Sequence, residues 1–185
     1  NVDNLHERAG SSHIIHLHGE LTKVCSSRDP YNPHYIKELK PEEYEVKIGD
    51  RAGDGTQLRP FIVWFGEAVP QIETAIQYVE KADIFVIIGT SLNVYPAAGL
   101  LHYVPKGAEV YLIDPKPVDT HTSRSIHVIQ KGASEGVAEL KKKLLLFVAY
   151  LICFITYFPA NAGEKIFATY FDIPINSPAG TEVTG

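Results

Sequence analysis

One segment of the chain is apolar at nearly every position. Residues 83–89 read DIFVIIG, and each of the five positions between Asp83 and Gly89 is apolar. A strand covered on one face alternates apolar and polar residues, whereas a central parallel strand is covered on both faces and is apolar throughout. We therefore predict a buried central strand. This strand favours an α/β fold, in which helices cover a mostly parallel sheet.

Along the rest of the chain, short apolar runs typical of strands alternate with segments of helical periodicity, as such a fold requires. Short runs rich in Val and Ile predict further strands at residues 13–17, 61–65, 109–114 and 126–129. Between them, a helix is predicted from Pro70, with one buried face formed by Val69, Ile72, Ala75, Ile76 and Val79. Two more helices are predicted at 97–103 and 135–146. The pattern predicts a doubly wound parallel sheet within a domain at residues 1–143.

Residues 20–58 differ from the rest of this domain. They carry many charges, and their prolines and glycines break any regular period: Pro30, Pro33, Pro41, Gly49, Gly53 and Gly55. We interpret this stretch as a small irregular insertion.

Composition narrows the functional classes. The 185 residues are 45% apolar and 21% charged, which excludes a fully disordered chain and a multi-span membrane protein. A formal net charge of −5 argues against nucleic-acid binding. Cys25 and Cys153 form no CxxC pair, which excludes a four-thiolate zinc site and favours a reducing, cytoplasmic location. The chain contains no Met and opens at Asn1 in mid-pattern, which predicts a fragment or a processed chain.

Residues 144–185 change character. Three lysines precede fifteen residues, 144–158, of which only Thr156 is polar. A bilayer span needs about 20 residues. Three interpretations stay open: the last helix continues and packs through Val137, Leu140, Leu144 and Phe147; residues 144–158 associate with a membrane; or a signal-bearing segment has been joined to another domain.

The first candidate site lies near the start of the chain. Asn1 and Asp3 place an amide and a carboxylate two positions apart, and residues 16–19 read HLHG. Histidine suits general-base chemistry near neutral pH, and a glycine beside it lets other groups approach closely. The alternative is that these histidines are structural.

Two further candidates follow predicted strands. Gly89, Thr90 and Ser91 follow the most apolar strand, and Asp114 ends the next one. Ligands of doubly wound sheets bind beyond the carboxyl ends of the strands, and a carboxylate there can accept from ribose hydroxyls. The alternatives are an ordinary strand-to-helix turn and a turn aspartate before Pro115.

Residues 58–67 form a β-rich run that ends at Gly66 and Glu67. Such an edge can pair with an extended peptide by strand addition. Taken alone, the run favours the other interpretation, a buried strand with Trp64 and Phe65 in the core.

Together these motifs resemble the sirtuins, the NAD-dependent protein deacylases. Five motifs match in order: the segment from Asn1 to Gly10, His16 to Gly19, Phe65 to Glu67, Gly89 to Leu92, and Lys131 to Ala133. The form Arg-Pro-x-x-Val-Trp-Phe-Gly-Glu resembles the bacterial branch that includes desuccinylases. The implied reaction transfers the acyl group of an acyl-lysine protein or peptide to NAD, yielding lysine, nicotinamide and O-acyl-ADP-ribose.

The resemblance implies a role for each matching residue. His18 is the expected general base, and Asn1 holds the NAD ribose or a water. Cofactor contacts are expected from Asn1, Asp3, Gly89, Thr90, Ser91, Asp114 and Ala133. Substrate contacts are expected from Val63, Phe65, Gly66, Glu67, Asn93 and Val94.

Two departures from the family pattern modify these expectations. Sirtuins usually hold zinc with two CxxC pairs between the His-Gly and Phe-Gly-Glu motifs. This chain has only Cys25 in that interval. We therefore expect no zinc and an insertion held by packing alone. The family's first strand, phosphate loop and acyl-pocket residues precede the Asn-x-Asp motif. We therefore expect an incomplete Rossmann-like sheet, poor NAD binding and weak turnover. The alternative function is a non-catalytic NAD- or peptide-binding module.

Overall fold

The computed structural model describes residues 1–120, 122–155 and 166–170, with the backbone alone for 147–155 and 166–170. The chain divides into two compact units, Asn1–Ala75 and Ile76–Gly185. Each unit is described by itself.

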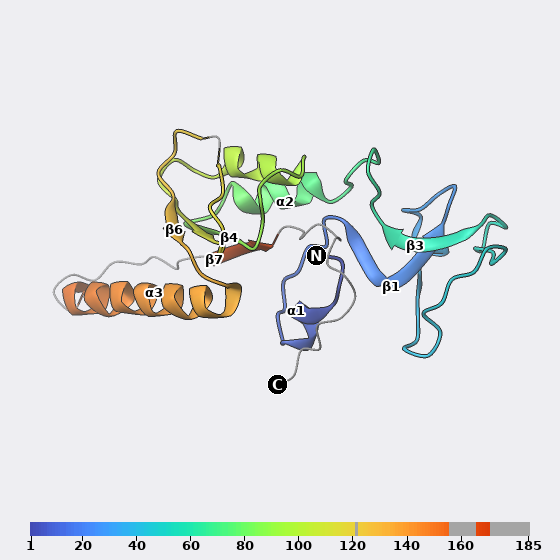
Figure 1. Ribbon diagram of the computed structural model, residues 1–185, viewed down its shortest axis with the longest axis horizontal. Coiled ribbons are helices and arrows are strands. Elements are labelled where there is room, and N and C mark those ends of the chain that lie inside the picture. Colours follow the sequence, from blue (N-terminus) through green and yellow to red (C-terminus); the bar gives the residue numbers. More distant parts are fainter. Residues whose placement is uncertain (121, 156–165, 171–185) are drawn as a thin grey trace. The chain divides into compact units, whose positions relative to one another are not determined.

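The first unit is built on a small antiparallel sheet (Figure 1). Helix α1 (Leu5–Arg8) precedes strand β1 (Gly19–Ser26), and the 3₁₀ helix η1 (Pro33–Tyr35) separates β1 from β2 (Lys37–Glu38). Strand β3 (Leu58–Ile62) completes the sheet in the order β2-β1-β3. Its pairing with β1 shifts register between Glu20 and Val24, as at a β-bulge.

Three predictions for this unit are wrong. Residues 13–17 form no strand, and the strand predicted at 61–65 lies at Leu58–Ile62, antiparallel to β1 rather than in a parallel sheet. The insertion at 20–58 is not wholly irregular, because β1 and β2 fall within it. The sequence did not reveal β1 because its buried residues are consecutive, Val24, Cys25 and Ser26, and not an alternating apolar set.

The second unit contains a parallel sheet, as predicted (Figure 1). Strands β4 (Ile84–Ile88), β5 (Glu109–Ile113), β6 (His127–Ile129) and β7 (Ile166–Tyr170) are all parallel, in the order β6-β5-β4-β7. Every residue of β4 is buried. The buried face of the sheet packs on helix α3 (Ala133–Ile155) through Ile113, Ile129 and Leu140.

The three predicted helices are present, two of them with changed limits. Helix α2 (Ile72–Val79) buries Ala75 and Val79, in agreement with the predicted apolar face. The helix predicted at 97–103 is the 3₁₀ helix η2 (Ala97–Tyr103). Helix α3 (Ala133–Ile155) starts earlier and ends later than the predicted 135–146.

Helix α3 bears on the interpretations of the tail. The helix continues past Lys143, and Leu140 and Leu144 contact the core as the packing interpretation predicts, whereas Val137 is exposed. The side chain of Phe147 lies outside the described residues. Within the described parts of the chain, no helix combines the length and the apolarity that a membrane span requires.

Candidate functional site

His18 and Gly19 lie where the chain enters β1. Gly19 has φ +84°, and a Cβ built there would lie 2.1 Å from the carbonyl oxygen of Phe61 on β3. The backbone N–H of Val63 donates a hydrogen bond of 2.9 Å to the carbonyl of His18. The glycine therefore permits the close approach that the sequence predicted. It also brings the backbones of the predicted base and the predicted acyl-lysine acceptor together.

The Asn1–Asp3 segment is tied to the same strand. The N–H of Leu21 on β1 donates to the carbonyl of Val2, at 2.7 Å. Asp3 is half-buried, and its Oδ1 accepts a 3.0 Å hydrogen bond from the N–H of Leu5 at the start of α1. Three predicted site segments that are far apart in sequence, at Asn1–Asp3, His18 and Val63, thus meet around the start of β1.

The turn after β3 is held by a carboxylate. Glu67 accepts from the Trp64 N–H at 3.0 Å, and Arg59 contacts both of its carboxylate oxygens, at 2.9 and 3.1 Å. The hydrogen bond from Arg59 lowers the pKa of Glu67. Gly66 has φ +87°, a conformation that glycine adopts without strain.

This turn presents its aromatic side chains outward. Trp64 is 53% exposed and Phe65 is 99% exposed. The interpretation of both residues as core is therefore wrong, because β3 ends at Ile62 and the turn that follows points them away from the sheet.

The predicted cofactor residues of the second unit lie along one edge of its sheet. Ile88, Ile113 and Ile129 are paired in register, so the residues that follow them leave the sheet at the same carboxyl edge. Those residues are Gly89 to Ser91 after β4, Asp114 after β5 and the segment leading to Ala133 after β6. This edge is the ligand-binding edge of doubly wound sheets.

The polar groups at this edge are shaped by local turns. Gly89 has φ +64°, and the buried hydroxyl of Thr90 accepts from the N–H of Leu92 at 3.1 Å. Asp114 Oδ1 accepts a hydrogen bond from the N–H of Lys116 at 2.8 Å. Asp114 therefore stabilises the turn before Pro115, as its alternative interpretation predicts. Asn93 is exposed, and the Val94 carbonyl already accepts from the N–H of Ala98 at 2.8 Å.

A polar network holds the insertion together. The fully buried Ser26 hydroxyl contacts Asp54 Oδ2 at 2.7 Å and the Thr56 hydroxyl at 2.9 Å, and accepts from the N–H groups of Arg28 and Asp29. Hydrogen bonds from Thr56 and Ser26 lower the pKa of Asp54 to about 2. The expectation that packing alone holds this region is therefore wrong.

Cys25 does not fit the zinc site that the family resemblance implies. Its thiol is buried and donates to the carbonyl of Pro60 at 3.7 Å. Burial raises the pKa of this thiol, which disfavours the thiolate that zinc requires.

Sequence reasoning missed three residues that shape these sites. Arg59 holds Glu67, and Asp54 holds the insertion. Gly136 lets α3 approach β5 so closely that a Cβ would lie 2.2 Å from Ile113 Cγ2. Arg59 stands in the quoted Arg-Pro motif, whereas Ser26, the buried partner of Asp54, and Ile113, the neighbour of Gly136, are distant in sequence and leave no periodic signal.

Comparison with known proteins agrees with this arrangement. The model of the Sir2 family matches residues 1–96. An NAD-dependent protein deacylase of Bacteroides thetaiotaomicron is 91% identical over 145 residues, which cover 78% of this chain and 62% of the relative. The chain belongs to the Sir2 family.

Solved structures support the same assignment. A Sir2 homologue in complex with NAD matches with a TM-score of 0.63 and 34% identity, over 78% of this chain and 57% of the other. Sir2Tm bound to a propionylated peptide matches with a TM-score of 0.63 and 27% identity, over 77% and 61%. The fold is thus a partial Rossmann-like α/β fold. The chain spans about three fifths of the length of the curated relative.

Proposed function

We propose that this chain carries out NAD-dependent removal of acyl groups from protein lysines, acetyl and succinyl among them. The observation that carries the proposal is the hydrogen bond between the Val63 N–H and the His18 carbonyl. This backbone contact between the two segments that resemble the family's base and its acyl-lysine acceptor supports the proposal. Relatives named as NAD-dependent protein deacylases supply the reaction class.

Within this proposal each unit has its own task. In the first unit, the His18 imidazole accepts a proton from a ribose hydroxyl, Asn1 and Asp3 hold the ribose and carboxamide, and the Val63 carbonyl accepts from the acyl-lysine amide. The backbone of the Phe65–Glu67 turn pairs with the substrate main chain.

The second unit holds the remaining contacts. Gly89, Thr90, Ser91, Asp114 and Ala133 face the adenosine half of the cofactor at the sheet edge, and Asn93 and Val94 pair with the substrate. When bound, NAD supplies the ADP-ribosyl group that accepts the acyl oxygen.

Three narrower proposals accompany this function. The chain works without zinc at the family's cysteine positions, because Cys25 is a buried thiol that donates a hydrogen bond to the carbonyl of Pro60. Its substrates are acyl-lysine proteins or peptides and not nucleic acids, given the net charge of −5. Its location is cytoplasmic, where a free buried thiol stays reduced.

The first test uses the full chain in excess over an acetyl- or succinyl-lysine peptide with saturating NAD. We expect slow deacylation that falls by roughly 10²- to 10⁴-fold in His18→Ala, the range for loss of a general base. His13→Ala is the matched control and keeps the parent rate. Equal rates in His18→Ala and the parent chain would contradict the proposal.

A second test separates a wrong function from a cofactor site that also needs residues of the relative outside the aligned part. The aligned residues of this chain replace those of the Bacteroides thetaiotaomicron deacylase. We expect the chimera to deacylate within about tenfold of the relative's rate, and the His18→Ala chimera to be inactive. An inactive chimera that binds the acyl peptide normally would instead support the non-catalytic binding module.

A further inference from the structure

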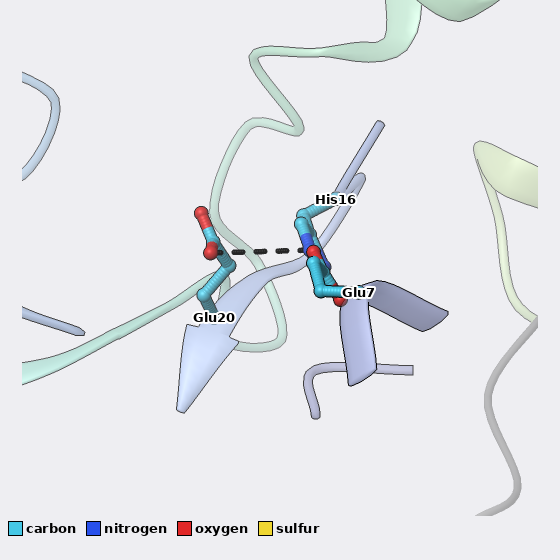
Figure 2. A group of neighbouring side chains, drawn as sticks. All are labelled: Glu7, His16 and Glu20. Carbon is cyan, nitrogen blue, oxygen red and sulfur yellow. Dashed lines mark hydrogen bonds and ion pairs between the residues drawn. The ribbon is translucent and has the colours of Figure 1, made fainter. Parts of the chain in front are cut away.

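A group of metal-ligating side chains lies beside the site described above and takes no part in the proposed reaction. Glu7 comes from α1, His16 from the segment before β1, and Glu20 from β1 itself. Each offers one ligand atom, and these atoms lie within 4.8 Å of one another. Figure 2 shows the three side chains converging from these segments.

The contacts within the cluster already join its members. His16 Nε2 lies 2.5 Å from Glu7 Oε1 and 3.9 Å from Glu20 Oε2. Lys23 occupies the other oxygen of Glu20, Oε1, at 2.6 Å, and this contact leaves Oε2 directed toward His16. One imidazole nitrogen is thus placed near one oxygen of each carboxylate.

Burial and charge also suit a cation. The side chains of His16, Glu20 and Glu7 are 14%, 20% and 40% exposed, so the cluster is partly desolvated and still open on the Glu7 side. Glu7 and Glu20 each bring one carboxylate to the cluster, and Lys23 is ion-paired with Glu20.

The spacing fits a small divalent ion after a modest side-chain movement. Ligand bonds of about 2.0–2.1 Å in tetrahedral geometry place two donor atoms roughly 3.3 Å apart. Glu7 Oε1 therefore has to move about 0.8 Å away from His16 Nε2, and Glu20 Oε2 about 0.6 Å toward it. The two carboxylate oxygens, which lie within 4.8 Å of each other, have to approach by up to about 1.5 Å. Both are terminal atoms of flexible side chains, and Glu7 is the most exposed of the three.

The donor set indicates which ions bind. An imidazole suits zinc, copper, iron and nickel, whereas sites for magnesium and calcium consist of oxygen atoms. One nitrogen and two carboxylate oxygens therefore favour Zn²⁺ over Mg²⁺ or Ca²⁺. With three protein ligands, a fourth position stays open to water.

We propose that Glu7, His16 and Glu20 bind one exchangeable Zn²⁺ ion. The site differs from the family's cysteine zinc site in its position, its ligands and its open coordination. The bound ion replaces the direct contact between His16 and Glu7 and links α1 to the start of β1. The proposal does not rest on the deacylase function, because its readout is metal binding.

Isothermal titration of the chelator-treated full chain with ZnCl₂ tests the proposal. We expect one equivalent to bind, and His16→Gln, Glu7→Gln and Glu20→Gln each to weaken binding tenfold or more. His13→Gln is the matched control and binds as the parent chain does. MgCl₂ at the same concentrations gives no binding.

Two results would overturn the proposal. One is an absence of Zn²⁺ binding by the parent chain, which would leave the cluster as an ion pair only. The other is unchanged binding in His16→Gln, which would assign the zinc to groups elsewhere, such as the cysteine thiols.

A measurement on the unmodified chain covers the case in which a variant does not fold. In ¹³C-resolved NMR spectra of the histidine rings, ZnCl₂ shifts the His16 ring signals and leaves those of His13 in place. A shift confined to other histidines would contradict the assignment.

Discussion

Strand β4 of the second unit is buried along its whole length, whereas β1 of the first unit is fully buried only at Gly19 and at its last three residues. The second unit packs aliphatic side chains between a parallel sheet and a helix. The first unit relies on hydrogen bonds to buried polar groups, above all around Ser26 and Asp54. The two units are thus stabilised by different forces and are expected to respond to different perturbations.

The largest expected effect comes from the core of the second unit. Ile87 is fully buried in β4, and Ile87→Ala lowers the free energy of unfolding by about 3 kcal/mol. The matched control, Ile48→Ala, removes a fully exposed isoleucine of the first unit and changes stability by less than about 0.5 kcal/mol.

Urea unfolding followed by two probes measures these changes and tests the separation of the units. Trp64 is the single tryptophan and reports on the first unit, whereas far-UV circular dichroism reports on both. A shift of the circular dichroism transition without a shift in Trp64 fluorescence supports independent stabilisation. Identical shifts in both signals would show that the two units unfold together and are not stabilised independently.

A second effect tests the close approach of α3 to β5. Gly136→Ala places a methyl group against the fully buried Ile113, and overpacking of this kind costs about 1–3 kcal/mol. Gly107→Ala, where a Cβ meets no atom within 4 Å, is the control and leaves stability nearly unchanged. Thermal unfolding measures both variants, and equal melting temperatures would show that α3 shifts to accommodate the methyl group.

The first unit is expected to respond to pH. The folded-state pKa of Asp54 is lowered from 3.8 to about 2, so its stabilising contribution is present above about pH 4 and is lost as the pH falls through 2. Asp54→Asn lowers the melting temperature by roughly 5 °C at neutral pH and removes this acid-dependent loss. Glu38→Gln, on the exposed strand β2, is the control.

Trp64 fluorescence measures the acid dependence between pH 4 and pH 2 in the parent chain and in both variants. A parent chain whose stability is constant over this range would contradict the role given to Asp54. Equal behaviour of Asp54→Asn and Glu38→Gln would do the same.

The smallest effect concerns the turn that presents Trp64 and Phe65. Glu67→Gln keeps the size of the side chain but weakens its contact with Arg59, a partly exposed pair worth about 1 kcal/mol or less. If the turn binds peptide, KM for an acyl-lysine peptide rises roughly threefold and kcat changes little. A fall in kcat at constant KM would instead place Glu67 in the chemical step.

The same contrast between the units explains how far the sequence predicts the fold. Strand β4 was predictable because burial on both faces leaves an uninterrupted apolar run. Strands β5 and β6 were predictable from shorter runs that contain Val and Ile, although β6 is buried only at Ile129. Strand β1 was not, because its sequence mixes Lys23 with the buried Val24 and Ser26. Hydrophobic patterns indicate where apolar residues are buried. They carry little information where the buried side chains are hydroxyls that form hydrogen bonds.

The candidate site divides in a similar way. The His-Gly pair drew attention to His18 and Gly19 from local chemistry alone, and the structure shows why that glycine is needed. The meeting of His18 with Val63, and of Val2 with Leu21, depends on pairings between distant segments that periodicity cannot give. The roles of Asn1, Asp114 and Ala133 in cofactor binding remain predictions.

The most direct test of the account is the product balance of the reaction. The full chain is incubated with NAD and an acyl-lysine peptide, and nicotinamide, O-acyl-ADP-ribose and free lysine peptide are quantified together by mass spectrometry. The account predicts equal amounts of all three at any rate of turnover, and amounts lower by roughly 10²- to 10⁴-fold in His18→Ala. Deacylated peptide formed without NAD consumption, or in equal amount by His18→Ala, would contradict it.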